Sequence, residues 1–205
     1  MKNKYKLIAL FVVLLFILFP MMNLFSQNND DGFLNSDFIQ NIVESAKEFQ
    51  DDSFELTRVK LTKPETDRKF YNSTAVFKLQ TDIKINESGF LGDGKYFSAL
   101  FIDKDGVFDL SQVFFSEDNE DGYNPLITKE EDNKLQTFYG TQTGKHYLIG
   151  ILSKEIPYFG NIYSNIGGLN PRARDRYVQH MKSELEEKKA SVYVIEFEVN
   201  PNELD

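Results

Sequence analysis

Three arginines near the C-terminus form the most unusual group of chemically active side chains, and they follow a signal for the start of a helix. These are Arg172, Arg174 and Arg176. Asn170 and Pro171 precede them and predict the first helical turn, because Asn is a good N-cap and Pro is favoured at the first helical position. The helix dipole disfavours positive charge there, so the arginines could hold an anion or an acidic segment of a partner. The alternative is a solvated helix face on which Asp175 and later glutamates balance the charge.

Aromatic residues are concentrated just before this helix. The candidates for a contact surface are Tyr158, Phe159 and Tyr163. Exposed rings there would suit a protein or glycan partner, although the absence of Trp from the chain weakens the glycan version. Packing of the same rings into the core is the interpretation that the composition favours, and the exposed contact surface is the alternative. Residues 157–176 are therefore the predicted segment for binding a partner or an anion.

The remaining chemistry-bearing residues predict no metal site and no cofactor. The chain has no cysteine, which excludes disulfides, thiol nucleophiles and Cys-ligated metals. His146 and His180 are its two histidines, and a zinc site would need them to converge with a carboxylate from distant segments. The acidic loop at 117–122 has the composition of a loose calcium site, but a solvated loop is the default interpretation.

Catalytic motifs are equally scarce. Residues 140–145 (Gly-Thr-Gln-Thr-Gly-Lys) have three residues between the glycines, where a phosphate loop needs four, so we predict a hairpin turn there. No Gly-x-Ser-x-Gly motif surrounds a serine, and no carboxylate pair stands out for glycoside hydrolysis. A hydrolase of envelope polymers, or a domain that binds a small ligand or an ion, is therefore the alternative function.

The charge balance and the length narrow the class of protein further. The 205 residues carry 23 Lys and Arg against 32 Asp and Glu, a net charge of −9. Because nucleic-acid binding needs a surplus of basic residues, we exclude a general nucleic-acid binder. The length fits one globular domain with a terminal extension.

That extension is an export signal at the N-terminus. Three lysines, an apolar run at 7–19 and Pro20 have the order of a signal peptide that ends at Ser26. The sequence Phe-Ser-Gln at 25–27 resembles cleavage sites common in the Bacteroidetes. The alternative is a retained signal anchor, in which residues 7–25 hold the chain in the membrane. Both interpretations place the rest of the chain in the periplasm or cell envelope, because the lysines stay inside. Removal of residues 1–26 would change the net charge to −12, since that segment holds three lysines and no acidic residue.

Residue patterns after the signal predict a short tether at 27–35 and a single β-rich domain at 36–205. Apolar residues at helical spacing predict an amphipathic helix of about 13 residues after Ser36. A second helix is expected from Asn170 to about Lys189, just before the last strand. No element is assigned to 156–168.

Alternating apolar residues predict about seven strands. Two of them, 96–102 and 107–115, are joined by an Asp-Gly turn, which is a strong hairpin signal. The others are expected near 56–61, 70–79, 134–139, 145–152 and 190–199, with 83–85 either continuing or restarting the second of these. The expected fold is α+β, an antiparallel sheet or sandwich with a helix at each end of the domain.

The middle of the chain also resembles a known bacterial family. The resemblance is carried by residues 94–106 (Gly-Lys-Tyr-Phe-Ser-Ala-Leu-Phe-Ile-Asp-Lys-Asp-Gly), 124–127 (Asn-Pro-Leu-Ile) and 144–156 (Gly-Lys-His-Tyr-Leu-Ile-Gly-Ile-Leu-Ser-Lys-Glu-Ile). Together these segments resemble the domain of unknown function 4384, over roughly residues 94–159. The resemblance implies a β-rich fold that is often exported or attached to other domains, and it implies no functional residues.

The function that these observations favour is a non-enzymatic interaction module, exported or tethered to the membrane. Its expected partner is a protein of the cell envelope, and its expected surface lies within 157–176.

Overall fold

The computed structural model describes residues 32–64, 69–70, 73–86, 95–110, 126–127, 135–164 and 170–205. Its helices are α2 (Asp37–Lys47) and α4 (Pro171–Glu187). Its longer strands are β1 (Phe54–Thr62), β4 (Phe77–Ile85), β5 (Lys95–Asp103), β6 (Gly106–Asp109), β8 (Leu135–Gly140), β9 (Gly144–Ser153) and β11 (Ser191–Val199). Four two-residue strands are β2 (Lys69–Phe70), β3 (Ser73–Thr74), β7 (Leu126–Ile127) and β10 (Ile162–Tyr163).

Both helices begin at the capping residues that the sequence predicted. The Ser36 hydroxyl accepts a hydrogen bond from the Ile39 N–H at 3.4 Å, and the Asn170 side chain accepts one from the Ala173 N–H at 2.9 Å. These side chains satisfy N–H groups that have no partner within the helix. The buried residues of α2 are Phe38, Ile39, Ile42, Val43, Ser45 and Ala46, and those of α4 are Val178, Met181 and Leu185. Each helix therefore turns one apolar stripe inward.

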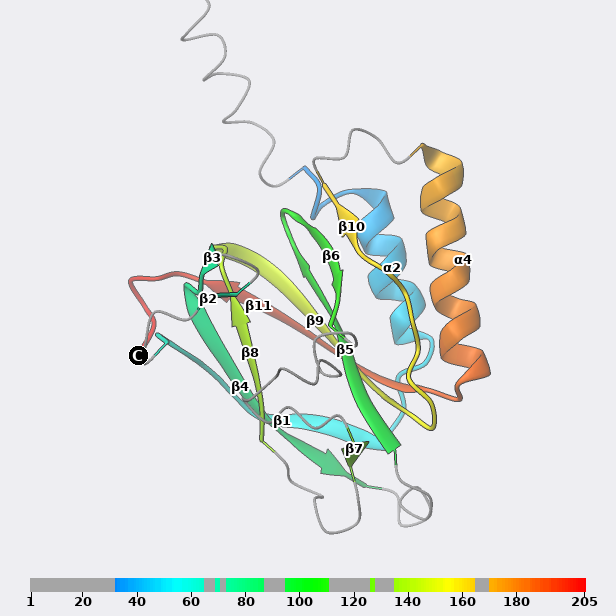
Figure 1. Cartoon of the computed structure of the whole chain (residues 1–205), viewed down its shortest axis with the longest axis horizontal. Helices are drawn as coiled ribbons and strands as arrows, with labels where there is room; N and C mark the ends of the chain where they lie inside the picture. Colours follow the sequence, from blue (N-terminus) through cyan, green and yellow to red (C-terminus); the bar gives the residue numbers. More distant parts are fainter. Residues whose placement is uncertain are drawn as a thin grey trace, which may run out of the picture.

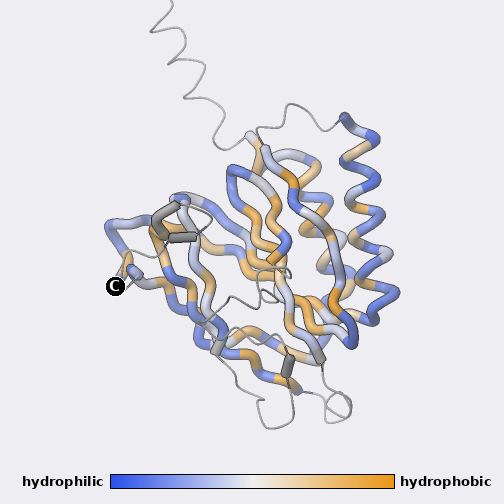
Figure 2. Tube along the Cα trace, in the orientation of Figure 1, coloured by the Kyte–Doolittle hydropathy of each residue, from blue (hydrophilic) through white to orange (hydrophobic). Residues whose placement is uncertain are grey.

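The strands form two main antiparallel sheets that pack in layers with the helices (Figure 1). The larger sheet has the order β10-β6-β5-β9-β11, with β7 paired to β5, and the smaller has the order β1-β4-β8. One apolar cluster joins α2 and α4 to the larger sheet, and a second cluster fills the space between the two sheets. Figure 2 shows apolar residues concentrated in the central strands and α4 as largely hydrophilic. The predicted α+β fold with antiparallel sheets and a helix towards each end is confirmed.

The strand β9 lies inside the larger sheet, between β5 and β11, and is covered on both faces. Ile149 and Ile151 lie in the cluster under the helices, whereas Leu148 and Leu152 lie in the cluster between the sheets. This double burial explains the nearly continuous apolar run of β9, because a strand covered on one face would alternate with polar residues. Its neighbours are β5 and β11, both antiparallel to it.

The predicted hairpin turn at residues 140–144 is wrong. The strand before it, β8, pairs with β4 in the smaller sheet, and β9 pairs with β5 and β11 in the larger one. The segment therefore crosses between the sheets instead of joining two paired strands. Gly144 makes this crossing with a φ of 96°, a left-handed conformation that glycine adopts without a steric penalty.

Several predicted boundaries can be compared with the described residues. β4 runs unbroken from Phe77 to Ile85, so 83–85 continue the predicted strand. β6 ends at Asp109, and residues 111–115 of its predicted strand lie outside the described residues. The signal segment 1–26, residues 27–31 of the tether and the acidic loop 117–122 also lie outside them. Within the described end of the tether, Leu34 is buried in the cluster beneath the helices, so packing begins before Ser36.

Gly140 at the end of β8 has no room for a side chain. A Cβ atom there would stand 2.2 Å from ring carbons of Phe77, which is completely buried. We expect Gly140→Ala to lower the free energy of unfolding by about 1–3 kcal/mol, because overpacking forces neighbouring side chains from their rotamers. Urea denaturation measures the loss.

The matched control for this prediction is Gly150→Ala on β9. Its Cβ would lie 3.0 Å from a terminal methyl carbon of Leu56, which can move aside, so we expect a smaller loss. Equal denaturation midpoints for the two variants would contradict the steric argument.

Candidate functional site

Within residues 156–168, to which the sequence assigned no element, residues 157–163 form an extended strap, and residues 165–168 lie outside the described residues. The strap runs between the β6 edge of the larger sheet and α4, and its last two residues form β10 (Figure 1). Ile162 and Tyr163 pair with Val107 and Gly106 of β6. Its earlier residues make no regular strand, so side chains must satisfy their backbone groups.

On the sheet side, Asp109 at the end of β6 holds the strap. Its Oδ2 atom accepts hydrogen bonds from the Phe159 N–H at 2.8 Å and from the Gly160 N–H at 3.1 Å. In return, the Asp109 N–H donates to the Asn161 side-chain oxygen at 2.7 Å. Asp109 is 3% exposed, so these bonds lie in a nearly water-free environment. The strap is thus attached to β6 from both directions.

On the other side, α4 holds the main chain of Tyr158. Glu184 accepts the Tyr158 N–H at 3.0 Å, and His180 Nε2 lies 2.9 Å from the Tyr158 carbonyl oxygen, where a ring N–H donates. The Tyr177 hydroxyl donates to the Gly160 carbonyl at 3.4 Å. Burial, together with the charge of Asp109, raises the pKa of Tyr177, so this hydroxyl keeps its proton. Tyr177, His180 and Glu184, which lie on successive turns of α4, thereby fix the strap against this helix.

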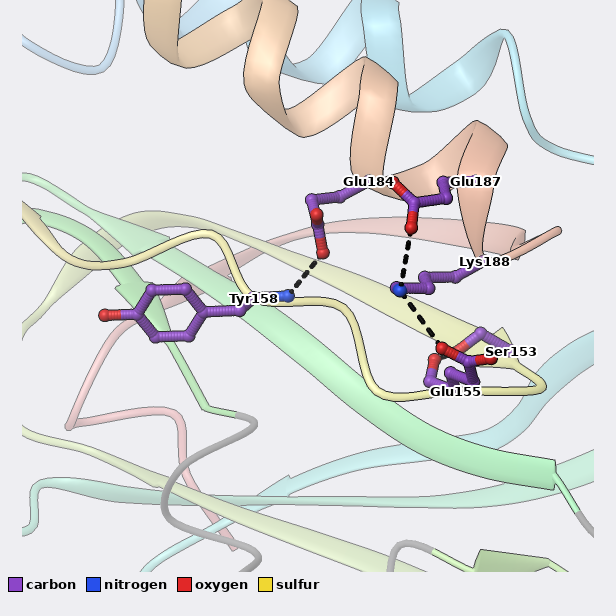
Figure 3. Close-up of polar contacts among 6 residues, drawn as sticks. All are labelled: Ser153, Glu155, Tyr158, Glu184, Glu187 and Lys188. Atoms are coloured by element: carbon purple, nitrogen blue, oxygen red, sulfur yellow. Dashed lines mark hydrogen bonds and ion pairs between the residues drawn. The ribbon is translucent and has the colours of Figure 1, made fainter.

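The turn that precedes the strap is held by two ion pairs of Lys188, which Figure 3 shows beside Tyr158. Lys188 Nζ lies 3.0 Å from Glu155 and 3.1 Å from Glu187. Hydrogen bonds to these two carboxylates raise the pKa of Lys188. The Ser153 hydroxyl donates to the Glu155 carbonyl at 2.7 Å, so this serine serves the turn after β9.

The three predicted aromatic contact residues have different environments. Tyr158 is 55% exposed and Tyr163 is 44% exposed, whereas Phe159 is buried at 4% in the cluster beneath the helices. The prediction of an exposed surface is therefore wrong for Phe159, because its strap position faces the core. Figure 3 shows the Tyr158 ring pointing away from Glu184, the α4 side chain that accepts its N–H. The Tyr163 ring makes an edge contact with Phe108 at 5.7 Å between centroids.

The three arginines do not form one surface either. Arg172 and Arg176 are exposed, and Arg176 Nε donates to the Arg172 carbonyl at 3.2 Å. Arg174 is half-buried, and its guanidinium carbon lies 5.7 Å from the centre of the Phe38 ring on α2. Residues two positions apart project about 200° apart around a helix, so Arg174 faces α2 while its neighbours face away. Arg174 therefore does not share the exposed face of Arg172 and Arg176.

The two histidines have different environments. His146 is completely buried on β9, and His180 is an exposed residue of α4. Among the described residues, no group of three or more His, Asp and Glu side chains is arranged to hold a metal ion. In the same part of the chain, neither helix has the length and apolar character needed to cross a bilayer.

Asp109 and Glu184 were missed by the sequence analysis. Asp109 is 50 residues from Phe159, and Glu184 is 26 residues from Tyr158, so no local spacing connects them. The sequence does contain one weak indication of the role of Asp109. It stands between Phe108 and Leu110 in an apolar strand, where a carboxylate needs hydrogen-bond donors.

The fold and the strap define an α+β domain of two sheets with one helical layer. In comparisons with protein-family models, with curated proteins and with solved structures, nothing matches this chain. The resemblance of residues 94–159 to the domain of unknown function 4384 stays a prediction.

Removal of the Asp109 carboxylate should loosen the strap. We expect Asp109→Ala to lower the free energy of unfolding by about 2–4 kcal/mol, because it leaves two N–H donors without their acceptor. Amide hydrogen exchange at Phe159 and Gly160 should become faster at the same time. The control is Asp105→Ala, which removes an exposed carboxylate from the β5–β6 turn. Unchanged exchange at both amides in Asp109→Ala would show that other contacts hold the strap.

Proposed function

We propose that this chain is a non-enzymatic interaction module of the cell envelope, and that it contacts an envelope protein through the strap and the adjacent face of α4. The contact residues would be Tyr158, Tyr163, Arg172 and Arg176. Phe159 and Arg174 support this surface from below, through the core and through α2.

One observation carries the proposal: the strap is fixed on both sides while two of its tyrosine rings are exposed. Asp109 and α4 hold the backbone of the strap through hydrogen bonds at 2.8–3.4 Å. An aromatic side chain on a fixed backbone loses little conformational entropy when it binds. Tyrosine and arginine are also enriched among residues that dominate binding energy.

Charge supports an acidic partner segment beside the rings. The chain has a net charge of −9, yet Arg172 and Arg176 are exposed on one side of the first turns of α4. Local positive charge on an acidic protein favours one orientation of an acidic partner and disfavours others. The arginines would thus mainly determine orientation and association rate, and the tyrosines would supply apolar contact area.

The proposed location is the periplasm or cell envelope. It rests on the lysines, apolar run and Pro20 of the N-terminal segment, which have the order of an export signal. The resemblance to a family that is often exported is consistent with it. Mass spectrometry of the N-terminal peptide from native cells distinguishes a chain that begins at Met1 from one that begins at Gln27.

Two double variants test the proposed surface. We expect Tyr158→Ala with Tyr163→Ala, and Arg172→Glu with Arg176→Glu, each to reduce recovery of a cross-linked envelope protein at least tenfold. The reason is that each pair removes one half of the contact, apolar or electrostatic. Recovery is measured by quantitative mass spectrometry after in-cell cross-linking and purification through a tag after Asp205.

Two control variants separate binding from folding. Val59→Ala alters an exposed apolar residue on β1, away from the strap, and should leave recovery unchanged. Arg174→Ala should lower the free energy of unfolding by about 0.5–1 kcal/mol through lost contact with Phe38, with recovery retained. Full recovery with both double variants would remove this surface from consideration.

A further inference from the structure

His146 lies at the point where the two sheets meet, enclosed by aromatic rings. It is completely buried on β9. Its ring centroid is 5.1 Å from Phe77 of β4, 5.4 Å from Phe101 of β5 and 5.2 Å from Phe197 of β11. The imidazole therefore contacts strands of both sheets and takes a position that a phenylalanine could fill.

The hydrogen bonding of this ring is incomplete. His146 Nδ1 lies 2.8 Å from the Gly144 carbonyl oxygen, which can only accept, so Nδ1 carries the proton of the neutral ring. His146 Nε2 is buried and has no hydrogen-bond partner among the described residues. Protonation would create an N–H donor at this atom and a positive charge shared over the ring, inside an apolar enclosure.

The charged groups around the ring offer it little compensation. Lys145, Glu196 and Glu198 alternate in sequence with His146 and Phe197, and Lys145 and Glu196 form an ion pair at 2.9 Å on the opposite face of the larger sheet. Lys78 likewise alternates with Phe77 on β4 and points away from the ring. These four charges are therefore separated from the imidazole by the sheets themselves.

Asp103 on β5 is the titratable residue nearest in register on the same face. Ile102 pairs with Tyr147, which places Asp103 across from His146 at the end of β5. Asp103 is 4% exposed, and its Oδ1 atom accepts the N–H groups of Asp105 at 2.7 Å and Gly106 at 3.1 Å. The carboxylate is therefore committed to the hairpin turn and not to the imidazole.

We infer that the His146 enclosure is an acid-sensitive latch, in which protonation expels the imidazole from between the sheets and releases the Gly144–Val199 end of the β9–β11 pair. The released pairs would be those from Gly144 with Val199 to Leu148 with Ile195. Beyond them, Ile149, Ile151 and Val192 are completely buried in the cluster beneath the helices, so the pairs from Ile149 onwards would remain closed, although Tyr147 also reaches this cluster.

The order of protonation favours this release. Burial lowers the pKa of His146 to about 4, and the Gly144 carbonyl opposes that shift only in part. Burial raises the pKa of Asp103 to about 6. As the pH falls, Asp103 therefore loses its negative charge before His146 gains its positive one, so the imidazolium forms without a carboxylate counter-ion.

The signs of the two contributions to stability are opposite. The folded-state pKa of His146 is below its ordinary value of 6.5, so its contribution is full above pH 6.5 and is lost as the pH falls towards 4. The folded-state pKa of Asp103 is above its ordinary value of 3.8, so its contribution is full below pH 3.8 and is lost as the pH rises through 6. In the wild type the two opposite pH dependences of stability partly cancel. A test of His146 therefore needs a variant in which residue 103 does not titrate.

The experiment therefore uses Asp103→Asn as the parent, since an asparagine oxygen can still accept the turn N–H groups. We expect the folding equilibrium constant of this parent to fall roughly 100-fold more between pH 7.5 and 4 than that of Asp103→Asn with His146→Phe. Urea denaturation at both pH values measures it. His146→Gln in the same parent keeps a donor for the Gly144 carbonyl and should behave like His146→Phe, which guards against a folding defect of the phenylalanine variant.

Hydrogen exchange locates the opening. In the parent at pH 4, amides of residues 144–148 and 195–199 should lose protection relative to residues 149–153, after correction for the intrinsic pH dependence of exchange. The loss should be absent from both His146 variants. Equal pH dependence in the parent and both variants, or loss of protection spread evenly along β9, would overturn the latch.

Discussion

β9 has to bury both of its faces, and the arrangement of the layers follows from this constraint. A strand with apolar side chains on both faces needs a layer on each side. Ile149 and Ile151 are covered by α2 and α4, while Leu148 and Leu152 are covered by the smaller sheet. The two helices are far apart in sequence, yet both turn an apolar stripe towards the same face of the larger sheet. The strands of both sheets except β11 lie between the two helices in the sequence. The helices nevertheless belong to one domain, because they share a single apolar cluster.

The strap solves a different problem, which is how an irregular segment crosses an apolar surface. Its backbone N–H and C=O groups cannot be left unpaired between β6 and α4 without a large cost in free energy. Asp109, Tyr177, His180 and Glu184 supply the partners that a neighbouring strand would otherwise give. Because these side chains are committed to the backbone, the rings of Tyr158 and Tyr163 are left to face solvent. The polar side chains around the strap therefore have a structural role. The exposed rings of Tyr158 and Tyr163 are the part of the strap that is available for contact.

Local patterns predicted the elements well and their partners poorly. Ser36, Asn170 and Pro171 identify both helix starts, because capping is a short-range interaction between neighbours in sequence. The Asp-Gly turn identifies the β5–β6 hairpin for the same reason. The turn at 140–144 was misassigned because β8 and β9 carry strand patterns that look alike whether they pair with each other or with distant strands. What places β8 in the smaller sheet is its pairing with β4, from Phe77 with Gly140 to Asp82 with Leu135, and Phe77 and Gly140 are 63 positions apart. Asp109 was missed on the same grounds, since its partners are 50 and 51 residues away.

The division of the candidate site shows why proximity in sequence is a weak guide to a surface. Three arginines at alternate positions look like one cluster, but a helix distributes such positions over opposite sides, so Arg172 and Arg176 align while Arg174 meets α2. In the extended strap, neighbouring residues point in opposite directions instead, so Tyr158 is exposed and Phe159 is buried. The surface that results is made of every fourth residue from the helix and of selected residues from the strap. Which residues share this surface depends on the repeat of each element, about 3.6 residues in the helix and two in the extended strap. The residues could be assigned to one face only after each segment was known to be helical or extended.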